Sequence, residues 1–292
     1  MNGDRITNEQ CPSQTIHDTL SPCVYRMPET LFLIKFIVSV TVVIGLSVFA
    51  EKGSARVAGI LSGYPAGSAI NLFFFGLEIG PDFAAESAVY NMVGLVATQS
   101  CIYFYYKASS VAGRFNILLS SLAAVASYFV VVWLLHFIRT SSVVALTIPL
   151  LSVPFFIFLF RRIPNVKIRN RVPLTFGVLL LRALFAASSI LLITGTARSV
   201  GATYAGLFSA FPSTMFPFML IIHATYGAAT AHTVIKNYPI GSVSLIFYSL
   251  TVSLTYPVLG IYLGTLLCFI VATVCLVAYE IVRSRISRAI CT

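Results

Sequence analysis

The sequence predicts an all-α fold: a polytopic transmembrane bundle of about nine spans, built as two inverted four-helix repeats joined by a linker helix. Of its 292 residues, 58% are hydrophobic and only 10% are charged, whereas average globular chains carry about 25% charged residues. Apolar runs of about 20 residues, the length that crosses a bilayer as a helix, recur along the whole chain. A third observation is internal similarity at an offset of 147 positions.

The apolar runs are continuous rather than alternating, which favours helices over barrel strands. They follow a polar tail at 1–30, in which Cys11 and Cys23 either pair in an oxidising compartment or remain free thiols. The second and seventh runs are interrupted by proline and glycine. The nine expected spans are 31–50, 57–77, 83–106, 115–138, 142–160, 174–197, 202–224, 234–257 and 260–282.

Lys and Arg are distributed unevenly between the two sides of this topology. With the N-terminus outside, thirteen lie on the inner side: Lys52, Arg56, Lys107, Arg114, Arg161, Arg162, Lys167, Arg169, Arg171, Lys236, Arg283, Arg285 and Arg288. Four lie on the outer side: Arg5, Arg26, Arg139 and Arg198. This bias predicts a multi-pass protein of a bacterial or archaeal cytoplasmic membrane, with the N-terminus outside and the C-terminus cytoplasmic. It also accounts for the net charge of +10 without a nucleic-acid partner.

The repeat aligns without a gap from about residue 31 to 106. The matched pairs include Gly59 with Gly206, Pro65 with Pro212, and the cations Lys35 and Arg182; Gly80 and Gly94 fall on further glycines. Five spans separate the starts of the two copies, so the second copy enters the membrane from the opposite side. The expected organisation is a tail at 1–30, repeat 1 at 31–138, a linker helix and basic cytoplasmic loop at 139–177, and repeat 2 at 178–292.

Each broken span predicts backbone groups that need partners. Proline removes one helical hydrogen bond, and in lipid the freed groups must be satisfied by protein or by a water-filled cavity. Matching breaks in two inverted halves point to a transporter's binding site, whereas a simple kink would only let helices pack closely. The serines and the threonine beside the breaks suit either role. The expected substrate-binding residues there are Ser62, Gly63, Pro65, Ser209, Pro212, Ser213 and Thr214.

Charged residues within or beside the spans complete the candidate site. Arg182 lies about nine residues into its span, and with Lys35 it is expected to attract an anionic substrate group. An internal ion pair or a side chain reaching the interface is the alternative. Carboxylates follow the first break and histidines the second, and both groups can exchange protons when partly buried. The candidate proton carriers are Glu78, Glu86 and His223; the histidine spacing predicts no metal site.

The motif AG-[IL]-x-S-x-[YF]-P occurs at 58–65 and again at 205–212. It resembles the GlpM-like family of small bacterial membrane proteins, best over 204–257 and more weakly over 57–110. The resemblance implies a fused, inverted pair of units, each about the length of a family member. It supports architecture more than function.

No HExxH, GxSxG, Walker or dinucleotide motif is present, so neither an enzyme nor a cofactor is expected. The expected function is secondary transport of a small anionic or zwitterionic solute by alternating access, with proton coupling as an option. A lipid or polyprenyl-phosphate translocase, a metal or cation carrier, and a non-transporting scaffold subunit are the alternatives. A lateral groove open to lipid would favour the translocase. The expected partners are the solute and the lipid bilayer, and a homodimer is compatible with the sequence.

Overall fold

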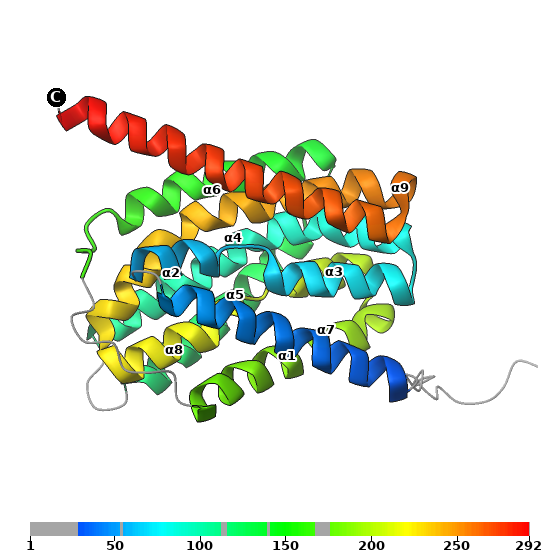
Figure 1. Cartoon of the computed structure of the whole chain (residues 1–292), viewed down its shortest axis with the longest axis horizontal. Helices are drawn as coiled ribbons and strands as arrows, with labels where there is room; N and C mark the ends of the chain where they lie inside the picture. The colour runs from blue at the N-terminus through cyan, green and yellow to red at the C-terminus, as the bar shows by residue number, and fades with distance from the viewer. Residues whose placement is uncertain (1–28, 53–54, 112–115, 139–140, 167–175, 292) are drawn as a thin grey trace, which may run out of the picture.

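A computed structural model of the chain describes residues 29–52, 55–111, 116–138, 141–166 and 176–291. The expected tail with Cys11 and Cys23 lies outside this part. The described residues form helices and no strand (Figure 1). The helices are α1 (Glu29–Lys52), α2 (Ala55–Ser62), α3 (Ala66–Glu78), α4 (Pro81–Val111), α5 (Asn116–His136), α6 (Ser142–Phe160), α7 (Phe176–Ser209), α8 (Met215–Tyr226) and α9 (Ala228–Cys291).

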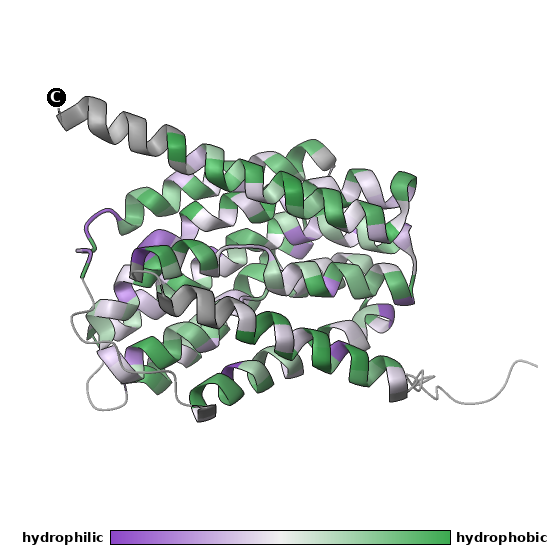
Figure 2. Cartoon of the chain, viewed as in Figure 1, coloured by the Kyte–Doolittle hydropathy of each residue, from purple (hydrophilic) through white to green (hydrophobic). Residues whose placement is uncertain are grey.

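The helical part is suited to a membrane. Hydrophobic residues cover most of the helical length (Figure 2). On α9, Leu263, Ile270 and Val274 share one face, and their side chains are 51–64% exposed. Such a face is costly in water and favourable against lipid tails. By length and composition, five helical segments among the described residues can cross a membrane: Arg56–Glu78, Asn116–His136, Val143–Phe160, Gly177–Ser209 and Ala228–Tyr279.

Two of these long helices are interrupted by glycine. Gly201 in α7 and Gly260 in α9 have φ values of 77° and 74°, a region that only glycine adopts readily. In a straight helix Tyr256 and Thr265 would be about 13 Å apart, but their hydroxyl oxygens are 2.7 Å apart. The second part of α9 therefore runs back along the first, as Figure 1 shows in orange and red.

The chain reverses in the same way at Gly201. Phe185 lies in the first part of α7, and its ring is 6.0 Å from that of Phe216 in α8. Phe185 and Phe216 are separated from Gly201 by similar numbers of residues, one before it and one after it. The second part of α7, followed by α8, therefore runs back along the first part of α7. The helices thus run along the long axis of Figure 1, and their ends gather at two ends of the molecule.

α4 occupies the centre of the bundle and packs against α5, α6, α7 and α9. Polar side chains within it, among them Asn91, Thr98 and Gln99, are fully buried. Because other helices surround α4, it does not need the apolar outer face that a lipid-facing helix requires. This explains why α4 is not among the five strongly apolar segments.

Candidate functional site

Both prolines interrupt a helix where the sequence predicts a break. α2 ends at Ser62 and α3 begins at Ala66, with Pro65 at its N-cap position. α7 ends at Ser209, and α8 begins after Thr214, which is its N-cap residue. Pro65 and Pro212 are both buried.

The two breaks lie against one another. A Cβ atom added to Gly67, just after the first break, would be 2.6 Å from Ser213 Oγ in the second. One residue further along α3, Ser68 Oγ donates a hydrogen bond of 2.8 Å to the carbonyl of Ser209. Segments far apart in the chain therefore meet at the centre of the bundle, and glycine is what allows the close approach.

The packing around the breaks is reciprocal. Gly59 of α2 lies against α9, where an added Cβ would be 2.5 Å from the carbonyl oxygen of Val234. Gly206 of α7 lies against α4 and meets the carbonyl oxygen of Ser87. Gly206 and Val234 follow Gly59 and Ser87 by the same 147 positions. A second pair of contacts is reciprocal in the same way. An added Cβ at Gly94 would meet Ala210 and Leu207, and an added Cβ at Gly241 would meet the corresponding residues Gly63 and Ile60. The helix before each break thus packs on the second helix after the other break: α2 packs on α9, and the second part of α7 packs on α4.

A buried amide joins the breaks to their neighbours. Asn91 of α4 donates to Ser209 Oγ at 2.7 Å and to Ser68 Oγ at 3.3 Å. Its carbonyl oxygen accepts from Ser249 Oγ of α9 at 2.7 Å. Four helices therefore share one polar cluster, and each of these hydrogen bonds is sheltered from water.

Side chains from other helices donate hydrogen bonds to backbone carbonyls at the second break. Tyr128 of α5 donates to the carbonyl of Leu207 at 2.7 Å. Thr98 of α4 donates to the carbonyl of Ala210 at 2.5 Å. Asn91, Thr98 and Tyr128 were not predicted from the sequence, where the only available signal was a polar group within an apolar span.

Two buried polar groups near the breaks have no hydrogen-bond partner in the described part of the chain. They are Ser213 Oγ and both side-chain polar atoms of Asn71. Asn71 lies one helical turn after Gly67, on the face of α3 that meets Ser213. Because an unsatisfied buried polar group costs about 1–3 kcal/mol, these atoms are suitable contacts for a bound polar ligand.

The other residues predicted to bind substrate at the breaks are Ser62, Gly63 and Thr214, and their described positions are within or between the helices of the bundle. Ser62 Oγ donates to the carbonyl of Ala58 at 2.6 Å within its own helix. Gly63 lies against the backbone of Gly241 in α9. Thr214 is half-buried at the start of α8 and makes no side-chain capping bond.

Lys35 is fully buried, although its place near a span end suggested that it could reach the interface. Its ammonium group forms an ion pair with Glu78 and donates to Thr194 Oγ1 at 2.9 Å. The same group lies 5.5 Å from the centre of the Phe74 ring. Lys35, predicted to bind substrate, and Glu78, predicted to carry protons, thus neutralise one another. The contacts of Lys35 join α1 to α3 and α7.

Arg182 is also buried, and its guanidinium lies 4.4 Å from the centre of the Phe218 ring in α8. Lys35 and Arg182 are 147 positions apart, and each lies over the ring of a phenylalanine in the helix that follows a break. Aromatic rings stabilise buried cations in this way.

The candidate proton carriers do not gather at one point. Glu86 is exposed on α4. His223 is buried, and its Nδ1 is 2.7 Å from the hydroxyl of Tyr105. His232 lies beside Ser109, with 2.7 Å between Nε2 and Oγ. No group of three His, Cys, Asp or Glu side chains in the described residues is arranged to hold a metal ion.

A lateral groove of about 270 Å³ lies beside the first break, between α1, α3 and the second part of α9. Most of its lining is apolar and includes Val38, Phe74 and Phe269. Phe74 also lies under the ammonium group of Lys35. Phe74 therefore separates the groove from the buried Lys35.

No family model, curated protein or solved structure matches the chain. The resemblance to the GlpM-like family stays a prediction from the motif. The helices and the site define the class: an α-helical membrane protein with two discontinuous helices whose breaks meet in its centre.

Proposed function

We propose that this protein is a secondary transporter that moves a small anionic or zwitterionic solute by alternating access between two inverted repeats. The observation that carries the proposal is the reciprocal packing of the two breaks. Gly59 and Gly206 make equivalent contacts in opposite halves of the molecule. Discontinuous helices at matching positions of inverted repeats are typical of transporter binding sites.

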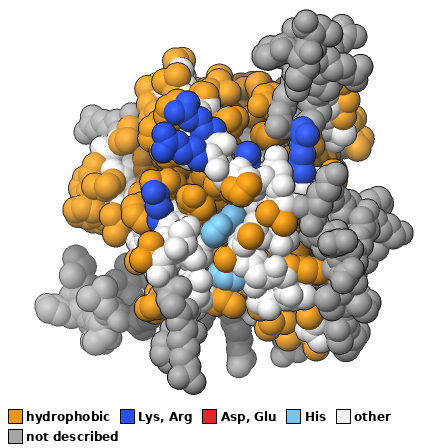
Figure 3. Space-filling view, turned by 90° about the vertical axis from the view of Figure 1, so that its left-hand side faces the viewer, with side chains coloured by type: hydrophobic (Ala, Val, Ile, Leu, Met, Phe, Trp, Pro, Cys, Tyr) orange, Lys and Arg blue, Asp and Glu red, His pale blue; other side chains and the backbone are white. Residues whose placement is uncertain are grey.

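We infer nine crossings. The reversals at Gly201 and Gly260 each divide a long helix into two passes, and each broken helix counts as one pass. Five crossings then separate the starts of the repeats, so the second repeat is inverted. Figure 3 shows one end of the molecule with Lys, Arg and His side chains and no visible Asp or Glu. The positive-inside rule assigns this basic end to the cytoplasm, with the N-terminus outside.

The contacts at the two ends suggest how access alternates. At the outer end, the ion pair of Lys35 and Glu78 holds α1 to α3. At the basic end, the hydrogen bond of Tyr105 and His223 holds α4 to α8. In the proposed cycle each contact opens in turn while the other holds. Protonation of Glu78 would remove the charge that holds Lys35, which provides a route for proton coupling.

The solute would bind where the breaks meet. The unpartnered groups of Asn71 and Ser213 offer hydrogen bonds there. Arg182 adds a buried positive charge on the neighbouring helix, and cations at that depth in a membrane mark substrate pathways. A small solute with a carboxylate or phosphate group fits this combination.

Proteoliposomes provide the test. Purified protein is reconstituted, and charge movement is recorded on a solid-supported membrane while small carboxylates, phosphates and amino acids are applied in turn. We expect at least one to give a saturable signal that Arg182→Gln abolishes. Arg56→Gln removes an exposed cation at the start of α2 and is the matched control. A wild-type signal in Arg182→Gln would remove the assigned role of that arginine.

The lateral groove favours a second candidate, a translocase of lipid phosphates. The lipid chain would lie in the groove between α1 and α9, and its phosphate would approach Lys35. A dithionite assay with fluorescent phospholipids in the same proteoliposomes distinguishes the candidates. Val38→Phe narrows the groove and should slow lipid translocation while leaving solute signals unchanged. Reconstituted protein that does not accelerate lipid exchange would exclude this candidate.

A further inference from the structure

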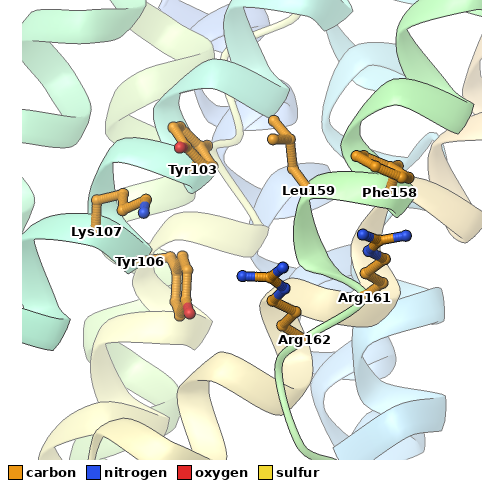
Figure 4. Close-up of a pocket in the computed structure, with 7 residues that line it drawn as sticks. All are labelled: Tyr103, Tyr106, Lys107, Phe158, Leu159, Arg161 and Arg162. Carbon is orange, nitrogen blue, oxygen red and sulfur yellow. The ribbon is translucent and has the colours of Figure 1, made fainter.

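A second pocket lies at the basic end, between the C-terminal part of α4 and the end of α6 (Figure 4). Its volume is about 240 Å³. α4 contributes Tyr103, Tyr106 and Lys107 to its wall, Phe158 comes from the end of α6, and Arg161 and Arg162 come from the turn directly after it. The pocket is separate from the facing breaks, so its role is independent of the proposed solute site.

Three cations converge on this pocket, and no described carboxylate lies in its wall. Two of them are supported by aromatic rings. The Arg161 guanidinium lies 3.9 Å from the centre of the Phe158 ring, and the Lys107 ammonium lies 5.8 Å from that of Tyr103. Like charges held together repel unless an anion joins them. The pocket therefore has the charge and the preformed walls to bind a phosphate group.

The surroundings indicate where that phosphate comes from. Leu151, Phe155 and Phe158 occupy one face of α6, and each side chain is 57–71% exposed. This apolar face ends at the pocket. A lipid whose chains lie on α6 would thus bring its headgroup to Arg161 and Arg162. Basic pockets at the cytoplasmic ends of membrane helices bind anionic headgroups in this way.

We propose that this pocket is a binding site for the phosphate of an anionic phospholipid, whose acyl chains pack on the outer face of α6. Arg161 and Arg162 donate to the phosphate oxygens, since the guanidinium fork matches phosphate geometry. Lys107 adds charge from the opposite wall, and the rings of Tyr103 and Tyr106 enclose the headgroup. The lipid bridges α4 to the linker helix α6.

Native mass spectrometry of the full chain in detergent tests the site, with phosphatidylglycerol and phosphatidylcholine titrated separately. We expect phosphatidylglycerol to bind more tightly than phosphatidylcholine, and Arg161→Gln/Arg162→Gln to weaken that binding roughly 30-fold. Arg56→Gln/Arg198→Gln removes the same charge elsewhere and should bind like the wild type.

The melting temperature without added lipid shows whether each variant is folded. Equal binding of the two lipids, or an unchanged affinity in the folded pocket variant, would overturn the proposal. Inorganic phosphate forms a separate arm, in which its effect on the melting temperature is compared with that of added phosphatidylglycerol. If it stabilises the protein as much as phosphatidylglycerol does, the ligand is a soluble phosphate and the lipid assignment is wrong. Because no step measures transport, the outcome is independent of the proposed function.

Discussion

Gly59→Ala tests the close packing on which the reciprocal arrangement rests. The added Cβ would lie 2.5 Å from the carbonyl oxygen of Val234 and 3.0 Å from Cβ of Asn237. Carbon contacts are favourable near 3.5–4.0 Å, so the first contact falls short by about 1 Å. A backbone carbonyl cannot rotate away, and α2 and α9 must separate along their contact. Overpacking of this kind costs about 1–3 kcal/mol.

The reciprocal variant sharpens the prediction. Gly206→Ala places a Cβ against the Ser87 carbonyl and 2.7 Å from Cβ of Tyr90, so we expect a similar loss. Gly63→Ala is expected to cost a similar amount, because an added Cβ would lie 2.6 Å from the carbonyl carbon of Gly241 and from the backbone nitrogen of Ser242. Gly45 has no atom within 4 Å of an added Cβ, and Gly45→Ala should be neutral or stabilising by about 0.5–1 kcal/mol.

Thermal unfolding followed by fluorescence-detected size-exclusion chromatography in one detergent measures the effect. At about 2–4 °C per kcal/mol, Gly59→Ala and Gly206→Ala should each lower the melting temperature by about 5 °C. The reasoning would be refuted if either variant melted at or above the wild-type temperature as a single symmetric peak, because the helices could not then be as close as described.

Three further predictions concern the ion pair, the second break and the topology. Lys35→Met leaves Glu78 without its cation and should destabilise the protein by about 3 kcal/mol, whereas the double variant Lys35→Met/Glu78→Leu should recover most of the loss. Equal melting temperatures of the single and double variants would argue against the ion pair. Tyr128→Phe leaves the Leu207 carbonyl with only the 3.3 Å hydrogen bond from the Ala210 amide and should cost about 0.5–1.5 kcal/mol in the same assay, so an unchanged melting temperature would show that another donor replaces the phenol. A fluorescent protein fused to the C-terminus should fluoresce in cells, while an N-terminal epitope should be accessible from outside; the reverse labelling would invert the orientation.

Helix positions followed from the sequence because they depend on local composition. Apolar length set the helices, and Pro65 and Pro212 set the breaks, since proline cannot complete the helical hydrogen-bond ladder. The offset of 147 positions also identified Gly59 and Gly206 as equivalent before their contacts were known. A glycine aligned with a glycine indicates that the backbone has no room for a side chain at that position. Gly59 and Gly206 both lie where two helices approach closely.

The partners of polar side chains could not be predicted in this way. Lys35 and Glu78 were assigned to separate tasks, and the structure pairs them. Asn91 and Tyr128 were not identified, although they satisfy groups at the second break. A buried polar side chain needs one nearby partner, and many arrangements of the same helices would supply different ones.

The sequence by itself determined the class of the protein, the location of its helices and the two places where they break, because hydropathy and proline act over a few residues at a time. Only the tertiary structure decided that the breaks meet, that α2 packs on α9 and the second part of α7 on α4, and which charges neutralise one another. Those features depend on which helix faces approach in three dimensions, and in a chain so uniformly apolar the approach is selected by glycine contacts and a few buried hydrogen bonds.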